Sequence, residues 1–581
     1  MKAESSGSRR KPDGRAEGHR SGHRAQPASH RQHGSRRGRR TLVVSLASAF
    51  LILGISAATG IAWDPFSVSG GSKAQAPQIG QPWSVTPSGR TPATRSEPPT
   101  TIPSATALAR PTPAPVEPPT TPGGGMATDP KPASAALPFD MPSAKTLRGS
   151  RRLVFAHYFT PYPLSLDNEP SERDYYTRNY LQPGGESGKH ERYGGLLRDR
   201  PLPVAPKSGD WELANLREEV RTARAAGIDG FSLDLLSLTG KNWERSNELL
   251  DAAASVDPAF KVMLMPDMTS LRADPVALAD ALARLAAKPA AHRLSDGRLV
   301  VSPFKAEAQD VGWWKQMLDR MRQQHRIEVA FVPLFLDYGS HSGEFSPISY
   351  GFSDWGSRSY TGQEGGTSDA RRAHSAGKIW MQPVSVQDAR PNQGIYDEAG
   401  NTSTLRSSWK HAIDGGADWV QLTTWNDYSE GSHFAPSLHN GYAYLDLTSY
   451  YLSRFKTGKW PKVVRDTVYL SSRTQFAHAT PVGAQDLVMR PREGTATPRD
   501  KVEVLSFLTA PATLRTTTGQ VKSSHRAPAG LHAELLPLRT GTSSAQSERQ
   551  GRVTARVELR YPVRDSVKVQ DLQYYAATSG R

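Results

Sequence analysis

The 581-residue chain contains no cysteine. This absence excludes disulfide bonds, a thiolate nucleophile and a thiolate metal site. A folded region must therefore be stabilised by core burial alone, which a domain of about three hundred residues can achieve. The chain also lacks a His-x-Glu-x-x-His motif, and no Gly-rich phosphate loop follows its first predicted strand. These two absences argue against a zinc site of that type and against a dinucleotide-binding fold.

Charge is distributed unevenly along the chain. The formal net charge is +16, and the first forty residues alone carry twelve Lys and Arg against three acidic residues, a net charge of +9. This basic tail, residues 1–40, has no aromatic residues that could stack on bases and no helical period. We therefore expect no nucleic-acid partner.

An uncharged, mostly apolar run of 23 residues, 41–63, follows the basic tail. It is long enough to cross a bilayer as a helix, and its positive flank is expected to stay in the cytoplasm. The small residues Ser56, Ala57 and Ala58 offer a processing site, but the lengths of the apolar run and of the basic stretch favour an anchor. We expect a single-pass cell-membrane protein with its remaining domains outside the cell, or a secreted protein if the segment is cleaved.

Residues 64–145 are rich in Pro, Thr, Ser and Gly, with the runs PTPAP and GGG. Such a composition cannot bury enough apolar surface to fold. We predict a disordered linker that holds the folded domains away from the membrane.

Strand and helix patterns alternate between residues 146 and 462. The predicted strands are 153–158, 228–236, 261–268, 299–304, 329–337, 351–355, 378–386 and 417–425. The predicted helices are 211–226, 242–255, 275–287, 311–325, 404–415 and 446–455. This α/β pattern predicts a (β/α)₈ (TIM) barrel, and a doubly wound parallel sheet is the alternative.

After residue 462 the sequence pattern changes to short segments in which polar and apolar residues alternate, such as 466–470, 502–507 and 553–559. Turn residues separate these segments. The pattern of residues 463–581 is typical of a β-sandwich. It could bind carbohydrate or serve as a structural module packed on the barrel, because a fold alone does not establish a function.

The segment 419–430, WVQLTTWNDYSE, is the most informative in the chain. It starts as a buried strand and ends in Asn426, Asp427 and Glu430, and a barrel places its active site at the carboxyl ends of its strands. Two carboxylates suit glycosidic cleavage, with inversion if they stand about 6.5–9.5 Å apart and retention at about 5 Å. The alternative for Asp427 and Glu430 is an Asx turn or a helix cap.

Other polar and aromatic residues fall at the predicted strand ends. They are His157, Tyr158, Asp234, Asp267, Lys305, Glu307, Asp337, Tyr338, Asp354, Trp355, Gln382, Trp425 and Tyr428. The aromatic rings can stack on the apolar faces of sugars, and Asp234 can bind hydroxyl groups or form a structural ion pair. His157 can contact substrate or be a satisfied barrel histidine. We predict no metal or cofactor, with a metal site of His157, Asp267 and Asp337 as the alternative.

Three segments resemble glycoside hydrolase family 71, the endo-1,3-α-glucanases or mutanases. They are VFAHY at 154–158, AGIDGFSL at 226–233 and QLTTWNDYSE at 421–430. The resemblance covers about residues 151–475 and implies an inverting barrel with a C-terminal β-domain, in which Asp427 and Glu430 are the catalytic pair. The chain departs from the fungal members at Asp234, where they usually have Asn, and in a long loop, 161–206. A related barrel family linked to glycan assembly, with the motif Trp-Asn-Glu-Trp-x-Glu-Gly, is also similar to residues 425–431.

Together these observations predict an extracellular glycoside hydrolase that cleaves α-1,3-glucan or a related α-glucan with inversion. Glu430 is the expected proton donor and Asp427 the expected base. Residues His157, Tyr158, Asp234, Asp267, Asp337, Trp355, Gln382, Trp425, Asn426 and Tyr428 are expected to bind the polysaccharide, and we expect a monomer. The alternatives are a non-catalytic wall-associated glycan-binding protein, a related glycosidase acting on another polysaccharide, and a metal-dependent polysaccharide-modifying enzyme.

Overall fold

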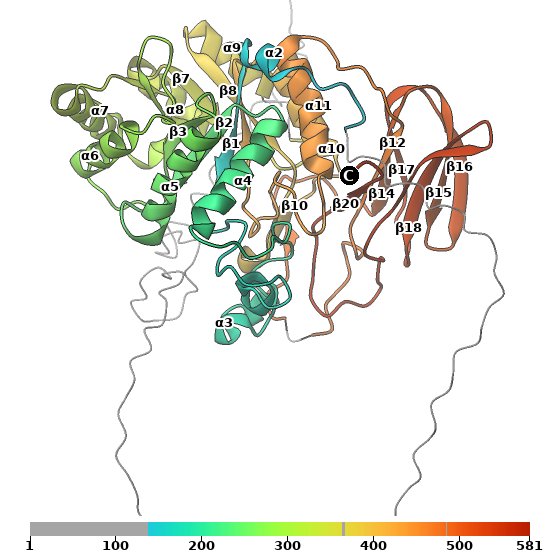
Figure 1. Cartoon of the computed structure of the whole chain (residues 1–581). Helices are drawn as coiled ribbons and strands as arrows, with labels where there is room; N and C mark the ends of the chain where they lie inside the picture. Colours follow the sequence, from blue (N-terminus) through green and yellow to red (C-terminus); the bar gives the residue numbers. More distant parts are fainter. Residues whose placement is uncertain (1–136, 363–365, 484) are drawn as a thin grey trace, which may run out of the picture. The chain divides into compact units, whose positions relative to one another are not determined.

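The computed structural model describes residues 137–362, 366–483 and 485–581 (Figure 1). The predicted basic tail, membrane segment and most of the predicted linker lie outside these residues. Within the described part of the chain, every helix is too short or too polar to cross a bilayer. Residues 137–145, at the end of the predicted linker, are ordered: Phe139 is buried against Tyr450, and Ser143 caps the short helix α2, Ala144–Arg148.

The centre of the molecule is a nine-stranded parallel sheet with the order β5-β4-β3-β2-β1-β11-β8-β7-β6. Its strands are β1 Leu153–Tyr158, β2 Gly230–Leu235, β3 Lys261–Pro266, β4 Leu299–Val301, β5 Val329–Phe331, β6 Leu334–Phe335, β7 Gly351–Asp354, β8 Ile379–Ser385 and β11 Trp419–Thr423. The two edge strands, β5 and β6, follow each other in the chain, separated by Val332 and Pro333 alone. Val332 N–H donates to Val301 of β4, and Ser353 N–H of β7 donates to Pro333. The short connection between β5 and β6 therefore bonds to strands near both edges of the sheet, which is strongly curled.

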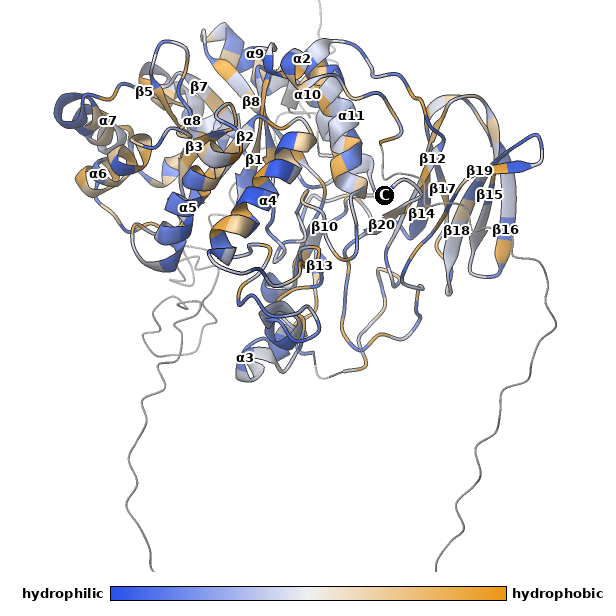
Figure 2. Cartoon of the chain, viewed as in Figure 1, coloured by the Kyte–Doolittle hydropathy of each residue, from blue (hydrophilic) through white to orange (hydrophobic). Residues whose placement is uncertain are grey.

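Helices alternate with these strands and surround the sheet (Figure 1). They are α4 Trp211–Ala225, α5 Gly240–Val256, α6 Pro275–Ala286, α7 Val311–His325, α8 Tyr338–Phe345, α9 Gly366–Ser375, α10 Ser403–Asp414 and α11 Ala443–Thr457. Asp210, Asp274 and Asp310 begin α4, α6 and α7 by accepting a backbone N–H, the preferred role of Asp at a helix start. In Figure 2, α4 and α6 each contain both hydrophilic and hydrophobic residues, as expected for helices that pack one side against a sheet.

The sheet has two apolar layers. Phe155, Met263, Val300, Met381 and Trp419 form a cluster on its inner side. The neighbouring residues on the same strands belong to the larger cluster that packs against the helices. Successive side chains of a strand point to opposite faces, so this assignment fixes the direction of each strand residue.

The long loop after β1 is folded on its own aromatic residues. It contains the short elements η1 Tyr176–Tyr180, α3 Gly185–Gly188 and η2 Glu191–Tyr193. Tyr162, Tyr176 and Tyr180 pack there with Tyr428, which follows β11. The remaining short elements are η3 Ala306–Ala308, η4 Ser346–Ile348 and η5 Pro391–Gln393.

Two four-stranded antiparallel sheets follow the curled sheet and form the C-terminal β-domain (Figure 1). One contains β17 Gly530–Pro537, β14 Lys501–Leu508, β12 Thr467–Ser472 and β20 Tyr575–Thr578, and the other β16 Val521–Ala527, β15 Ala512–Thr518, β18 Ser543–Arg549 and β19 Arg552–Glu558. Val468 and Val504 of the first sheet share one core with Leu514 and Val557 of the second.

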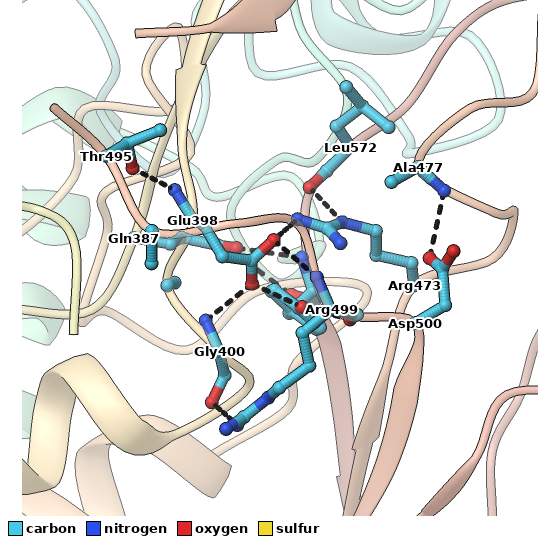
Figure 3. Close-up of polar contacts among 12 residues, drawn as sticks. Gln387, Glu398, Gly400, Arg473, Ala477, Thr495, Arg499, Asp500 and Leu572 are labelled. Atoms are coloured by element: carbon cyan, nitrogen blue, oxygen red, sulfur yellow. Dashed lines mark hydrogen bonds and ion pairs between the residues drawn. The ribbon is translucent and has the colours of Figure 1, made fainter. Parts of the chain in front are cut away.

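A small sheet joins this β-domain to the loop after β8. It consists of β9 Asp388–Arg390, β10 Ile395–Asp397 and β13 Arg490–Pro491. Beside it, the buried carboxylate of Glu398 accepts from Arg473 Nη2 at 2.6 Å, from Tyr574 at 2.6 Å and from Gly400 N–H at 2.7 Å (Figure 3). The β-domain thus fixes the loop that carries Asp388 and Arg390.

Candidate active site

Four carboxylates meet at the carboxyl end of the curled sheet. Asp234 ends β2, Asp267 follows β3, and Asp427 and Glu430 follow β11; we call these four residues the acidic cluster. All but Glu430 are at most 7% exposed. Burial raises the pKa of Asp234 well above its usual range, and the charges of Asp267, Asp427 and Glu430 raise it further. The structure thus brings together four residues that are more than 190 positions apart at the extremes of the sequence.

Asp427 is held in a tight turn. Its Oδ1 accepts from the Ser429 backbone N–H at 3.0 Å and from Ser429 Oγ at 2.6 Å. Its own N–H donates to Thr424 Oγ1 at 2.8 Å. Burial raises the pKa of Asp427, whereas the Ser429 hydrogen bonds and the Arg390 charge oppose that rise by favouring the carboxylate.

Glu430 has one bonded and one unbonded carboxylate oxygen. Oε1 lies 2.8 Å from Arg390 Nη1, and the buried Oε2 has no hydrogen-bond partner in the protein. Arg390 is shared, because its Nε and Nη2 donate to both oxygens of Asp388 at 2.7 and 2.6 Å. Burial therefore dominates and, with the charges of Asp427 and Asp388 adding to it, raises the pKa of Glu430 to about 8 despite Arg390.

His157 projects from the inner side of β1 toward Asp234. Its Nε2 lies 3.5 Å from Asp234 Oδ2, a separation typical of an ion pair. Burial, reinforced by the nearby Arg358 charge, lowers the pKa of His157 to about 3, while the pKa of Asp234 is raised. With a pKa of about 3 the imidazole of His157 is neutral near pH 7, so this contact is not an ion pair.

An aromatic ring and an arginine stand beside His157. Trp355, which follows β7, is partly exposed and packs edge-on to His157 with ring centroids 5.1 Å apart. The Arg358 guanidinium lies over the Trp355 ring at 4.7 Å, and its Nη1 donates to Ser385 Oγ at 2.7 Å. Arg358 is buried, yet its Nε and Nη2 have no partner in the protein.

Buried polar atoms without protein partners thus gather on the inner side of the sheet. They belong to His157, Asp234, Arg358 and Glu430. A buried polar group left unsatisfied costs about 1–3 kcal/mol, so such atoms are expected to bond to water or to a ligand. Sugar hydroxyl groups, which both donate and accept, are chemically suited to this mixed set.

Three predicted binding residues lie on the helix side of the sheet instead. Tyr158 donates to Glu219 of α4 at 2.8 Å, and Trp425 Nε1 donates to the other oxygen of Glu219 at 3.3 Å. Gln382 accepts from Trp380 Nε1 at 2.8 Å. The structure does not bring these side chains to the acidic cluster.

Other predicted residues hold loops in place. Asn426 bonds the backbone of Phe159 and Tyr162 with its whole amide, which fixes the loop after β1. Tyr428 packs in the aromatic cluster of that loop, and Asp337 caps α8. Asp267 belongs to the acidic cluster, but its oxygens also accept from Thr269 and Ser270.

The remaining strand-end residues lie elsewhere. Asp354 lies on the helix side of β7, where burial raises its pKa to about 7 with a further contribution from Asp369 of α9. Glu307 accepts from the Leu336 N–H at 2.7 Å, and Tyr338 packs on Trp380. Lys305 has a left-handed backbone conformation just before η3.

Arg358, Asp388 and Arg390 are not among the site residues predicted from the sequence, although each follows a strand of the sheet. Asp388 and Arg390 come three and five residues after β8 and obey the same strand-end rule as Asp427. That rule could have identified them. Their pairing with Glu430, by contrast, joins distant parts of the sequence and carries no local signal.

The alternative metal site of His157, Asp267 and Asp337 does not form as a group, because the ligand atoms of these residues do not all lie within 4.8 Å of one another and Asp337 caps α8. Within the described residues, the one set of three His or carboxylate side chains with ligand atoms within 4.8 Å of one another is His525, His532 and Glu534. This set lies in the β-domain and outside the acidic cluster.

A curled parallel sheet that presents paired buried carboxylates beside unpartnered polar atoms at its carboxyl end has the site of a glycoside hydrolase. The sequence profile of glycosyl hydrolase family 71 matches residues 204–580. The chain belongs to this family and is a glycoside hydrolase, so the family and the enzyme class expected from the sequence are both confirmed.

Two fungal proteins are similar to the chain. The glucan endo-1,3-alpha-glucosidase agn1 of Schizosaccharomyces pombe is 26% identical over 375 residues, which are 59% of this chain and 85% of that protein. The mutanase Pc12g07500 of Penicillium rubens is 25% identical over 401 residues, 64% of this chain and 86% of that protein. Among solved structures, the GH99 endo-alpha-mannosidase of Bacteroides thetaiotaomicron is 17% identical with a TM-score of 0.43, and the match covers 52% of this chain and 97% of that one.

Proposed function

We propose that the protein hydrolyses α-1,3-glucosidic bonds in an α-glucan, with Glu430 as the general acid and Asp427 as the general base. Membership of family 71 and the names of the two fungal relatives, a glucan endo-1,3-alpha-glucosidase and a mutanase, support the choice of α-1,3-glucan. The mixed donor–acceptor character of the inner polar atoms suits the hydroxyl groups of a polysaccharide.

The unlike surroundings of the two carboxyl groups carry this assignment. Asp427 accepts two hydrogen bonds from Ser429, which favour its charged form. Glu430 has a raised pKa of about 8 and an unbonded Oε2, so it is mostly protonated at pH 7 and free to donate. An acid and a base whose environments separate their protonation states are what glycosidic cleavage requires.

In the proposed reaction, Glu430 protonates the departing glycosidic oxygen while Asp427 takes a proton from the attacking water. The water adds to the anomeric carbon from the opposite side, so the product has the inverted configuration. The partly exposed Trp355 ring offers a surface for a sugar, and the free N–H groups of Arg358 offer donors for its hydroxyls. The buried Asp234, whose pKa is raised, can bond to a sugar hydroxyl.

We further infer that the curled sheet is a closed (β/α)₈ barrel over residues 146–462 and that residues 463–581 form a β-sandwich. The continuity of β5 with β6 supports closure, and the shared core of the two antiparallel sheets supports the sandwich. The apolar run 41–63 supports a single-pass anchor with the enzyme outside the cell.

The test is the release of reducing sugar from insoluble α-1,3-glucan by the full chain, with α-1,4-glucan and β-1,3-glucan in parallel. We expect release from the α-1,3-linked polymer alone, with the inverted anomer seen first by proton NMR. Preference for another linkage would refute the substrate, and a retained anomer would refute the mechanism. A protein that binds the polymer but releases nothing from any of the three would be a binding protein instead.

A further inference from the structure

Three possible metal ligands converge between the two sheets of the β-domain. His525 comes from β16, and His532 and Glu534 come from β17. Their ligand atoms all lie within 4.8 Å of one another, and the His525 ring contacts the Glu534 carboxylate. The two imidazole rings have centroids 6.3 Å apart.

The strand register explains why these side chains meet. In the antiparallel ladders His525 is paired with Leu514 and Glu534 with Val504, and paired residues share a face of the sheet. Leu514 and Val504 both belong to the core between the sheets, so His525 and Glu534 point inward. His532 lies two residues before Glu534 and has the same direction.

The position in the sandwich is also informative. Strands β16 and β17 are edge strands of different sheets, and residues 528–529 alone connect them. The three side chains therefore span the open edge of the sandwich. A group bound to all of them would tie one sheet to the other.

The protein satisfies the polar atoms of this cluster only in part. His525 Nε2 contacts Glu534 Oε2, but neither atom makes a hydrogen bond of regular geometry, and the buried Nδ1 of His525 has no hydrogen-bond partner. Partial burial lowers the pKa of His525, which favours the neutral imidazole that binds metals. The same burial raises the pKa of Glu534, a cost that a bound cation would remove.

We propose that His525, His532 and Glu534 bind one divalent transition-metal ion, with Zn²⁺ the best match, and that the ion holds the edges of the two sheets together. Two imidazoles and one carboxylate form a common three-residue set for Zn²⁺, with water as the fourth ligand. A chain without cysteine cannot join these edges by a disulfide. The site shares no residue with the acidic cluster, so the inference does not depend on the proposed reaction.

The experiment measures Zn²⁺ binding to the full chain, purified without a polyhistidine tag and stripped with EDTA. Isothermal titration and elemental analysis give the stoichiometry and affinity. Because the basic tail also contains histidines, the decisive comparison is between the parent chain and His532→Ala. We expect the variant to lose one equivalent of Zn²⁺ or to bind it at least about 100-fold more weakly.

Two matched variants keep the result interpretable. His478→Ala removes an exposed histidine elsewhere in the β-domain and should bind Zn²⁺ like the parent. Glu534→Gln preserves shape while weakening the ligand, and serves if His532→Ala does not fold. Zn²⁺ should raise the melting temperature of the parent and of His478→Ala by a few degrees and leave that of Glu534→Gln unchanged.

Equal Zn²⁺ binding by the parent and both cluster variants would overturn the inference. A melting temperature that Zn²⁺ does not change would also overturn the inference. The inward-pointing side chains of His525, His532 and Glu534 would then serve only to keep the edge strands from pairing with other chains. Loss of the metal effect in Glu430→Gln would also count against it, since that substitution lies outside the proposed site.

Discussion

The buried polar groups on the two sides of the curled sheet differ in their hydrogen bonding. On the helix side, Tyr158 and Trp425 share the carboxylate of Glu219, and Gln382 bonds to Trp380. On the inner side, His157 and Asp234 keep polar atoms without protein partners. These helix-side groups are therefore satisfied by other protein groups, whereas the inner groups keep polar atoms that a ligand can bond.

This difference separates structural from substrate-facing residues better than residue type does. Glu219 and Glu430 are both buried glutamates whose pKa burial raises to about 8. Glu219 accepts two hydrogen bonds from side chains of the sheet, and Glu430 has one oxygen free. A raised pKa indicates a catalytic acid only where the acid can reach a substrate.

The largest expected effect on activity tests the difference between these two glutamates. Glu430→Gln and Asp427→Asn should each lower kcat for α-1,3-glucan by about 10²–10⁴-fold, because each removes a proton-transfer group. Glu219→Gln, the matched control, should keep the activity of the folded protein. Circular dichroism gives the concentration of folded protein for each variant. If Glu219→Gln and Glu430→Gln lose the same kcat per folded molecule, the two sides of the sheet do not differ in function.

A second effect concerns the pH profile. Glu430 must be protonated to act as the acid, so kcat/KM of the parent should fall as pH rises through about 8. Arg390 lowers the pKa of both Glu430 and Asp427, so Arg390→Gln should move both limbs of the profile to higher pH. We expect kcat/KM at pH 7 to drop by about 10–100-fold as the base becomes more protonated.

The control for this profile is Arg492→Gln. Arg492 pairs with Asp397 at 2.8 Å and approaches Asp388 only to 3.9 Å, so its loss should leave the limbs near their original positions. An Arg390→Gln profile with unmoved limbs would mean that Arg390 does not set these protonation states.

A third and smaller effect sharpens the contrast between neighbouring aromatic residues. Trp355→Ala should raise KM by about 3–10-fold with little change in kcat, because it removes a stacking surface and not a reacting group. Trp425 faces Phe231 and Glu219, so Trp425→Phe should leave KM unchanged and reduce stability. The reverse pattern in steady-state kinetics would reassign the two rings.

The sequence predicts the repeating elements well because their signals are local. Each of the eight predicted strand segments contains a strand of the sheet, and the six predicted helices match α4, α5, α6, α7, α10 and α11 to within a few residues. The short helices α8 and α9 and the three-residue strands β9 and β10 go unpredicted, since so few residues show no period.

The site is less predictable than the fold, for two physical reasons. Strands of a parallel sheet covered by helices are apolar on both faces. The alternation of side chains along a strand therefore places His157 and Tyr158 on opposite faces of the sheet, but it does not show which of the two faces inward. The contacts that shape the site, such as Arg390 with Glu430, join residues far apart in sequence. Residue chemistry and strand position are enough to predict that Asp234 and Glu430 lie at the carboxyl end of the sheet. They are not enough to show that Tyr158, Gln382 and Trp425 lie on its helix side.

The smallest effect on activity is expected at Tyr158, next to His157 on the same strand. Tyr158→Phe removes one hydrogen bond to Glu219 and leaves a buried carboxyl oxygen unsatisfied, so the free energy of unfolding should fall by about 1–3 kcal/mol. Activity per folded molecule should not change, because the ring lies behind the sheet. Chemical denaturation and steady-state kinetics check the two outcomes, with Tyr350→Phe, a partly exposed ring, as the control. A Tyr158→Phe variant with full stability and a raised KM would place this side chain against the substrate and reverse the assignment of the two sides of β1.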